Sequence, residues 1–78
     1  MKSLMKVVEL IADKYINKCD VIVDEGIITV EFKDNVGNIY KTIQVTEFNA
    51  RLKVKFIPEG TTNIVNFEQL DDIIKKYV

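Results

Sequence analysis

The chain has 78 residues, which is enough for one small domain, so we expect a single domain over residues 1–78. Apolar residues make up 47% of the chain and charged residues 29%, a balance that excludes a disordered polypeptide. Eleven basic and twelve acidic residues give a net charge of −1, which argues against a polyanionic partner or an anionic membrane surface.

Two further features of the composition bear on the compartment. No apolar run is long enough for a signal peptide or a membrane span, so we expect no contact with a membrane. Cys19 is the only cysteine, which rules out an internal disulfide and fits a reducing compartment. We therefore expect a cytoplasmic protein.

Residues 2–18 show the apolar spacing of an amphipathic helix. The positions that form its apolar stripe are Leu4, Val7, Val8, Ile11, Tyr15 and Ile16. Charged residues occupy the other side, so the predicted helix buries one face against the rest of the protein. Because two of its residues are valines, which are poor helix formers, packing must hold this helix in place.

The run from Asp20 to Val23 allows two interpretations. It is either a short separate strand that forms a hairpin with the next one, or the first half of one long strand with a bulge at Gly26. Val21 and Val23 are odd-numbered, whereas the next strand buries even positions, so the buried face changes at Gly26. This change favours a break in the strand.

Three strands with regular alternation follow, over residues 27–33, 39–46 and 51–57. Turn residues at 34–37 and a connection at 47–50 join them, and Pro58 ends the third strand. The turns predict Val30 opposite Ile43 and Val45 opposite Leu52. The predicted inner face carries Ile28, Val30, Phe32, Ile43, Val45, Leu52, Val54 and Phe56.

Residues 61–65 are predicted to form a connector, and Asn66 is predicted to be the N-cap of a second helix. Gln69 completes a capping box with Asn66, while Val65 and Leu70 form a hydrophobic staple. The buried stripe of this helix would be Phe67, Leu70, Ile73, Ile74 and Tyr77. The predicted fold is thus α+β: a helix, a three- to four-stranded antiparallel meander and a helix, with both helices packed on one face of the sheet.

This order of elements is similar in topology to that of the double-stranded-RNA-binding domain. That family begins its second helix with a basic, Lys-rich motif, whereas the matching residues here, Phe-Glu-Gln-Leu-Asp-Asp at 67–72, are acidic. The glycine–proline–histidine-type loop of the family is also missing from residues 34–37. The resemblance therefore implies a topology, and RNA binding is not expected from it.

The residue types that carry catalysis or hold metals form no recognisable pattern. The chain has no histidine, and Cys19 consequently lacks the base that would activate it. Asp20, Asp24 and Glu25 lack the spacing of a calcium loop, and the three glycines are isolated, so no phosphate loop is present. We expect a non-enzymatic protein with no catalytic residues, no metal and no cofactor.

The uncovered face of the predicted sheet is the candidate interaction surface. Its residues come from the second and third of these strands and from the connection between them: Tyr40, Thr42, Gln44, Phe48, Arg51, Lys53 and Lys55. Lysines on an edge strand also protect a sheet from aggregation, and this structural explanation competes with a binding role. Phe48 either anchors a partner or packs back onto the core.

Lys41 breaks the inner pattern because it falls between Ile39 and Ile43. We expect its stem to cover apolar surface at the margin of the core while its ammonium group reaches water. The alternative is a buried salt bridge to an acidic residue of a helix.

These observations predict a small non-catalytic module that binds another protein or a second copy of itself. Nucleic-acid binding through Arg51, Lys53 and Lys55 is the alternative, and it would require more positive charge and more aromatic residues. Ten lysines against one arginine, with eleven isoleucines, are typical of an AT-rich genome. An accessory factor of a phage or mobile element, such as an inhibitor, would fit this description.

Overall fold

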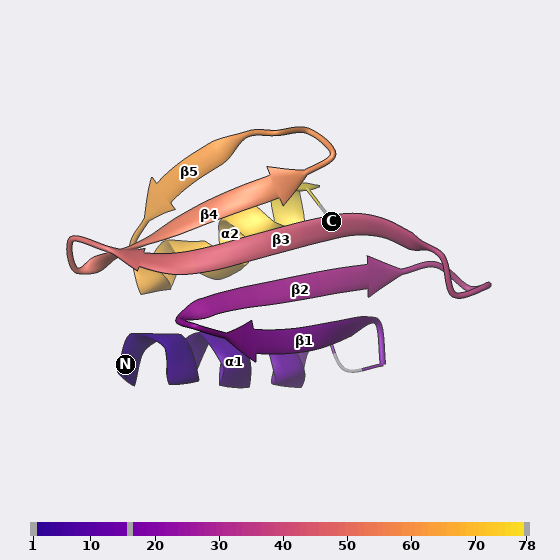
Figure 1. Cartoon of the computed structure of the whole chain (residues 1–78), viewed down its shortest axis with the longest axis horizontal. Helices are drawn as coiled ribbons and strands as arrows, with labels where there is room; N and C mark the ends of the chain where they lie inside the picture. Colours follow the sequence, from indigo (N-terminus) through magenta and orange to yellow (C-terminus); the bar gives the residue numbers. More distant parts are fainter. Residues whose placement is uncertain (1, 16, 78) are drawn as a thin grey trace.

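The computed structural model describes residues 2–15 and 17–77, which form two helices and one five-stranded antiparallel sheet (Figure 1). The elements are α1 (Lys2–Lys14), β1 (Cys19–Asp24), β2 (Ile27–Lys33), β3 (Ile39–Phe48), β4 (Arg51–Ile57), β5 (Thr62–Val65) and α2 (Phe67–Tyr77). Each strand pairs with the next one in sequence, so the sheet is a meander with β1 and β5 at its edges. The α+β class and the antiparallel meander are confirmed, whereas the predicted count of three to four strands is wrong.

The run from Asp20 to Val23 belongs to a separate strand, β1, which forms a hairpin with β2. Asp24 pairs with Ile27, leaving a two-residue turn of Glu25 and Gly26. Both turn residues have positive φ angles, 50° and 78°, as a mirror-image turn that matches the twist of a hairpin requires. The change of buried face at Gly26 therefore marks a reversal of the chain.

The fifth strand, β5, occupies residues that the sequence predicted as a connector. It pairs with β4 from Val65 opposite Leu52 to Thr62 opposite Lys55. The alternation of apolar and polar residues in β5 is interrupted by the polar Asn63 on the inner side. The sequence of this strand therefore lacks the apolar periodicity that predicts a strand. With five strands, the order of elements differs from that of the double-stranded-RNA-binding domain.

The pairing of β3 with β4 differs from the predicted register by two residues. Val45 lies opposite Val54, whereas Leu52 was expected there. A four-residue connection was expected, but both strands continue to a two-residue turn of Asn49 and Ala50. A shift of two residues leaves every side chain on its predicted face, so the division into inner and outer faces is retained.

The pairing of β2 with β3 follows the predicted register, with Val30 opposite Ile43. The turn between them depends on Asp34, whose carboxylate accepts hydrogen bonds from the backbone amides of Val36 and Asn38 at 3.0 and 2.9 Å. Asp34 is thus an Asx-turn residue, as the composition of this segment predicts.

The first helix is shorter than predicted, because α1 ends at Lys14 and does not reach Lys18. Asn17 has a φ angle of 66°, in the left-handed region that a right-handed helix cannot contain. Ile16, which was assigned to the apolar stripe, lies outside the described residues. The residues of α1 that are buried are Leu4, Val7 and Ile11.

The second helix matches its prediction closely. The backbone amide of Asn66 donates to Oε1 of Gln69 at 3.0 Å, which is one half of the expected capping box. Leu70 and Ile74 are fully buried. The helix residues that pack around them are Phe67, Ile73 and Tyr77.

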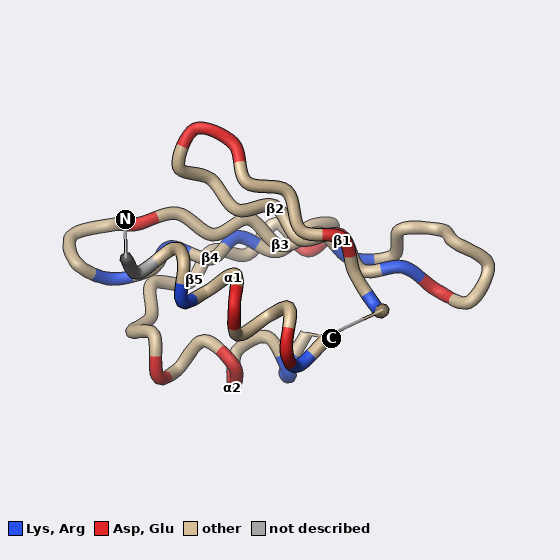
Figure 2. Tube along the Cα trace, turned by 90° about the horizontal axis from the view of Figure 1, so that it is seen from below, with Lys and Arg blue, Asp and Glu red and all other residues tan. Residues whose placement is uncertain are grey.

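Both helices lie on the same side of the sheet (Figure 2). α2 contacts β4 and β5, whereas α1 contacts β3 and α2. The buried side chains that the strands contribute to this layer are Ile28, Val30, Phe32, Ile43, Val45, Leu52, Val54 and Phe56. The opposite face of the sheet, which we call the outer face, has no helix over it among the described elements.

Lys41 is more buried than expected, with only 7% of its surface exposed. Its ammonium group pairs with the carboxylate of Glu59 in the turn between β4 and β5, and it lies 5.8 Å from the centroid of the Tyr77 ring. The prediction that the ammonium group of Lys41 reaches water is therefore wrong. A largely buried ion pair forms in its place, although the acidic partner belongs to a turn and was expected on a helix.

Candidate interaction surface

The strand registers determine which residues share the outer face. One row crosses all five strands and consists of Asp24, Ile27, Thr46, Lys53 and Ile64. The next row consists of Ile22, Thr29, Gln44, Lys55 and Thr62. A third consists of Asp20, Glu31, Thr42 and Ile57. Because opposed residues of an antiparallel pair point to the same side, each row is a strip of neighbouring side chains.

The seven residues predicted for the interaction surface lie on β3 and β4, and by alternation they belong to this face, with Tyr40 and Phe48 toward opposite ends of β3. Phe48 is the one whose setting differs, because it is the last residue of β3 and lies outside the turn. Its side chain is exposed, and the ammonium group of Lys53 lies 5.9 Å from the centroid of its ring. Phe48 therefore does not pack back onto the core.

Four isoleucines on the outer face were missed by the sequence reasoning. Ile27 and Ile57 sit at strand ends, and their outward direction follows from the alternation of β2 and β4. Ile22 lies on β1, for which the sequence allowed two interpretations. Ile64 lies on β5, which was predicted to be a connector. All four are more than one-third exposed, so the face is more apolar than its predicted residues indicate.

Charge on the outer face is separated by sign. β4 contributes Arg51, Lys53 and Lys55, none of which forms an ion pair within the described residues. Acidic residues gather on the other side, on β1 and β2. There Lys33 is neutralised by Asp20 at 2.6 Å, and the hydrogen bond that the Lys33 ammonium donates to this carboxylate, together with the carboxylate's charge, raises the pKa of Lys33.

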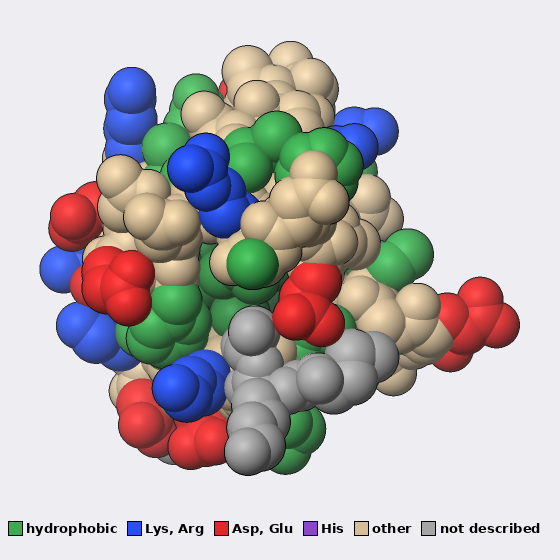
Figure 3. All heavy atoms as spheres, turned by 90° about the vertical axis from the view of Figure 1, so that its left-hand side faces the viewer, with side chains coloured by type: hydrophobic (Ala, Val, Ile, Leu, Met, Phe, Trp, Pro, Cys, Tyr) green, Lys and Arg blue, Asp and Glu red, His purple; other side chains and the backbone are tan. Residues whose placement is uncertain are grey.

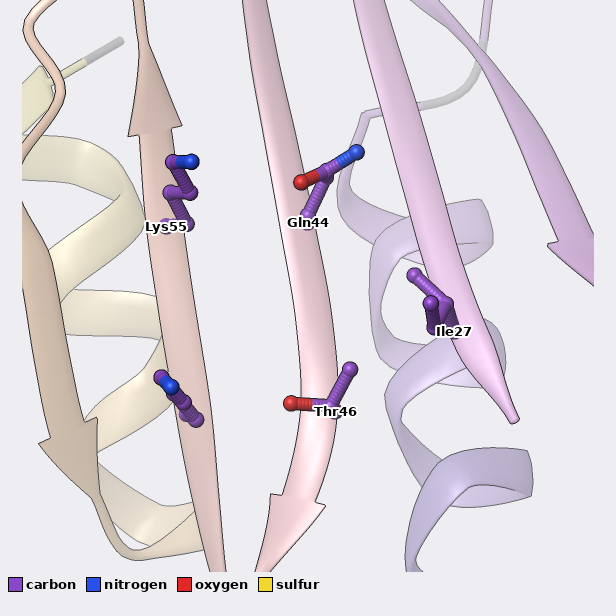
Figure 4. Close-up of a pocket in the computed structure, with 5 residues that line it drawn as sticks. Ile27, Gln44, Thr46 and Lys55 are labelled. Carbon is purple, nitrogen blue, oxygen red and sulfur yellow. The ribbon is translucent and has the colours of Figure 1, made fainter. Parts of the chain in front are cut away.

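A shallow hollow lies in the middle of the outer face (Figure 4). It has a volume of about 180 Å³ and is lined by Ile27, Gln44, Thr46, Lys53 and Lys55. Gln44 and Thr46 come from the central strand, with Ile27 on one side and the lysines on the other. This volume is too small for a typical small-molecule ligand, but it can receive one side chain of a partner. Ammonium, amide and hydroxyl groups beside an aliphatic wall suit a carboxylate on an apolar surface.

A second hollow of about 370 Å³ lies at the end of the β3–β4 hairpin, where Phe48, Asn49, Arg51 and Ile64 line it. This end of the sheet also carries the turn of the β1–β2 hairpin (Figure 1). That hairpin curves away from the helices toward the outer side, with red acidic residues at its tip (Figure 2). We call Asp24 and Glu25 the acidic tip. Figure 3, which views this end of the molecule, shows an acidic group projecting from one side of the surface, next to a hydrophobic side chain and tan atoms.

The chemistry of Cys19 does not support a reactive thiol. Its Sγ atom lies 3.6 Å from the carbonyl oxygen of Tyr15, which accepts a weak hydrogen bond. Partial burial, followed by the negative charge of Asp20, raises the pKa of the thiol, so it stays protonated at neutral pH. Across residues 2–15 and 17–77, no three metal-binding side chains come close enough to hold an ion.

Within the same residues, neither helix has the length and apolar character needed to cross a membrane. Comparisons of the chain with protein-family models, with curated proteins and with solved structures found no match.

Proposed function

We propose that the protein is a small non-catalytic module that binds another protein through the outer face of its sheet. The observation that carries this proposal is a set of large apolar side chains on that face, each between 38% and 49% exposed: Ile22, Ile27, Tyr40, Phe48, Ile57 and Ile64. One exposed apolar side chain is ordinary, but six on a face without a helix are typical of a docking surface. Their burial would supply about 25 cal/mol per Å² of apolar area.

The charges around these side chains support a protein as the partner. The apolar side chains lie on the edge strands or near strand ends, around a polar centre that includes Gln44 and Thr46, and basic and acidic groups stand on opposite sides. Such a mixture of apolar, polar and charged groups is typical of non-obligate protein interfaces. Rim charges contribute more to orientation and association rate than to affinity. The basic strand β4 and the acidic tip would thus fix the direction in which the partner docks.

Affinity capture from a native lysate tests the proposal with three forms of the protein. The outer-face variant carries Ile27→Ser and Ile57→Ser, and the control variant carries Met5→Ser and Val36→Ser, which remove exposed apolar side chains elsewhere. We expect wild type and control to recover the same protein, and the outer-face variant to lose it. Equal recovery by all three forms would contradict the proposal, as would no recovery combined with a monomer in light scattering.

Nucleic-acid binding is a second candidate, supported by one observation. Phe48 and Lys53 lie together beside Arg51, which offers an aromatic ring for stacking next to cationic groups. The acidic tip on the same side would repel phosphates, so we favour a protein partner. Fluorescence anisotropy with single- and double-stranded oligonucleotides at low salt tests this candidate. Binding that disappears in Lys53→Glu/Lys55→Glu would support it, and absent or unchanged binding would remove it.

We also propose that the module acts in the cytoplasm as an accessory factor of a phage or mobile element, such as an inhibitor. The single cysteine is free, which suits a reducing compartment. The excess of lysine over arginine and the high isoleucine content support an AT-rich genome of origin. If a captured partner were an enzyme of the host, its activity with and without the module would test the inhibitor role directly.

A further inference from the structure

The outer face carries both halves of a complementary charge pattern. The acidic tip stands on the β1–β2 side, and Arg51 and Lys53 stand on β4. Within the described part of the chain, neither group takes part in an ion pair. A partner that complements the whole face must be basic where it meets the acidic tip and acidic where it meets β4.

We propose that this partner is a second copy of the chain, packed outer face against outer face about a two-fold axis parallel to β3. The inference rests on the proposed function, because the same face is the contact surface. Rotation about this axis leaves each residue at the same position along the strand direction. It places β1 of one protomer over β5 of the other, and β2 over β4. The acidic tip of one protomer therefore lies over β4 and β5 of its partner.

The strand registers bring opposite charges to the same height. Asp24 shares its row with Lys53 and Ile64. Glu25 follows Asp24 toward the end of the sheet, where Arg51 begins β4 after the β3–β4 turn. In the dimer, Asp24 of each protomer lies over Ile64 of the other, with Lys53 on the adjacent strand, and Glu25 lies over the end of the sheet near Arg51. The contact is isologous, so it closes after two copies.

The alternative two-fold axis in the plane of the interface, perpendicular to the strands, does not give this match. It would place β1 over β1 and β4 over β4, so that acidic residues meet acidic residues and basic residues meet basic ones. Juxtaposed like charges oppose association. The separation of charge across the strands therefore selects the axis parallel to β3.

The shape of the face agrees with the same arrangement. The β1–β2 hairpin rises above the outer face (Figure 2), and the hollow of Phe48, Asn49, Arg51 and Ile64 lies where its partner's tip arrives. Five strands spaced about 4.8 Å apart, with an average length of about 23 Å, offer roughly 550 Å² per protomer. This area is at the low end for specific interfaces, so we expect a weak dimer that forms only at high protein concentration.

A charge-swap experiment in the analytical ultracentrifuge tests the inference. Wild type should dimerise between about 5 and 500 µM at low salt, and 1 M NaCl should weaken the dimer. Two variants, Arg51→Glu/Lys53→Glu and Asp24→Lys/Glu25→Lys, should each associate at least about tenfold more weakly than wild type. An equimolar mixture of the two variants should restore a dimer, which also shows that both variants are folded.

Three outcomes would overturn the inference. One is a wild type that stays monomeric at the highest concentration, and another is a variant mixture that fails to associate. The third concerns Val23→Lys, which adds a charge at the free edge of β1 on the inner side and should leave the dimer unchanged. Loss of the dimer in this variant alone would place the contact at the β1 edge.

The capture experiment keeps the two proposals separate. A monomeric wild type that captures a different protein through its outer face would refute the second copy and retain the protein-binding function. A monomer that captures nothing would refute both. A dimer that responds to the charge swap supports both.

Discussion

The ammonium group of Lys41 and the carboxylate of Glu59 form an ion pair at the inner margin of the sheet. Lys41 lies on the central strand β3, Glu59 lies in the turn that joins β4 to β5, and the ring of Tyr77 in α2 lies 5.8 Å from the ammonium. One buried cation therefore links three elements that are distant in sequence. Its stem packs where an apolar residue would otherwise continue the inner face.

The two partners of this ion pair should respond differently to substitution. Glu59→Ala leaves a buried ammonium group without its counter-charge, and we expect a loss of about 1–3 kcal/mol in the free energy of unfolding. Lys41→Met removes the charge and keeps the volume, so it should be neutral or stabilising. Urea unfolding measures both, with Glu9→Ala on the exposed side of α1 as the control. A Lys41→Met variant as unstable as Glu59→Ala would show that the ion pair itself stabilises the fold.

Asp71 joins the two helices, and it should govern the ionisation of Tyr15. Its carboxylate accepts hydrogen bonds from the Tyr15 hydroxyl at 3.2 Å and from the Lys14 ammonium at 3.1 Å. Burial, followed by the charge of Asp71 and this hydrogen bond, raises the pKa of Tyr15 from 10.0 to about 12. In an alkaline absorbance titration, the difference between wild type and Tyr15→Phe should show a phenolate transition near pH 12. Asp71→Asn should move this transition to lower pH, and an unchanged transition would rule out the role of Asp71.

The same pKa shift has a consequence for stability at alkaline pH. Below pH 10 the phenol is protonated in both the folded and the unfolded chain, so it adds no pH dependence. Between about pH 10 and pH 12 the unfolded chain loses this proton while the folded chain retains it, so stability falls as pH rises. Thermal unfolding should show a steeper alkaline decline for wild type than for Tyr15→Phe. Parallel declines would contradict the shift.

Asp71 should also contribute to stability on the acid side. Burial alone would raise the pKa of its carboxyl, but hydrogen bonds from Lys14 and Lys75, together with their charges, outweigh burial and lower it below 3.8. Its contribution is present above the ordinary value and disappears as pH falls through the folded pKa. We expect Asp71→Asn to reduce stability by about 1 kcal/mol at pH 7 and by less near pH 2. A difference that does not change with pH would contradict this interpretation.

The alternation of apolar and polar residues predicted the two faces of the sheet correctly, because a register error of two residues leaves each side chain on the same face. Thr46 and Lys53 are on the outer face whether β3 and β4 pair as predicted or two residues away, so the candidate residues were found although the register was wrong. The turn at Asn49 and Ala50 was missed because alanine gives no signal for a positive φ angle. β5 was missed because Asn63 interrupts its apolar pattern. The acidic tip could not be recognised as part of the outer face until the β1–β2 hairpin was known.

The turn between β3 and β4 offers a direct test of backbone conformation. Ala50 has a φ angle of 64°, and its side chain crowds the backbone in this left-handed conformation. Ala50→Gly removes this strain, so it should raise the free energy of unfolding by about 1 kcal/mol. Ala12→Gly, at an exposed position inside α1, is the matched control and should lower it by about the same amount. Equal losses in both variants would show that Ala50 is not strained.

Asn63 is a polar residue on the inner side of β5, opposite the fully buried Val54. Its Nδ2 group is inaccessible and has no hydrogen-bond acceptor among the described residues. A buried donor without a partner destabilises a fold by about 1–3 kcal/mol, and valine fits the strand better.

We therefore expect Asn63→Val to raise the free energy of unfolding by about 1 kcal/mol or more. Thr62→Val, the neighbouring outward-facing substitution on the same strand, controls for strand propensity and should change stability by less than about 0.5 kcal/mol. Because Asn63 points away from the outer face, its replacement should leave self-association unchanged. A destabilised Asn63→Val protein would mean that the amide has a partner that this conformation does not contain. A stabilised protein that no longer associates would mean that β5 must move for the outer face to bind.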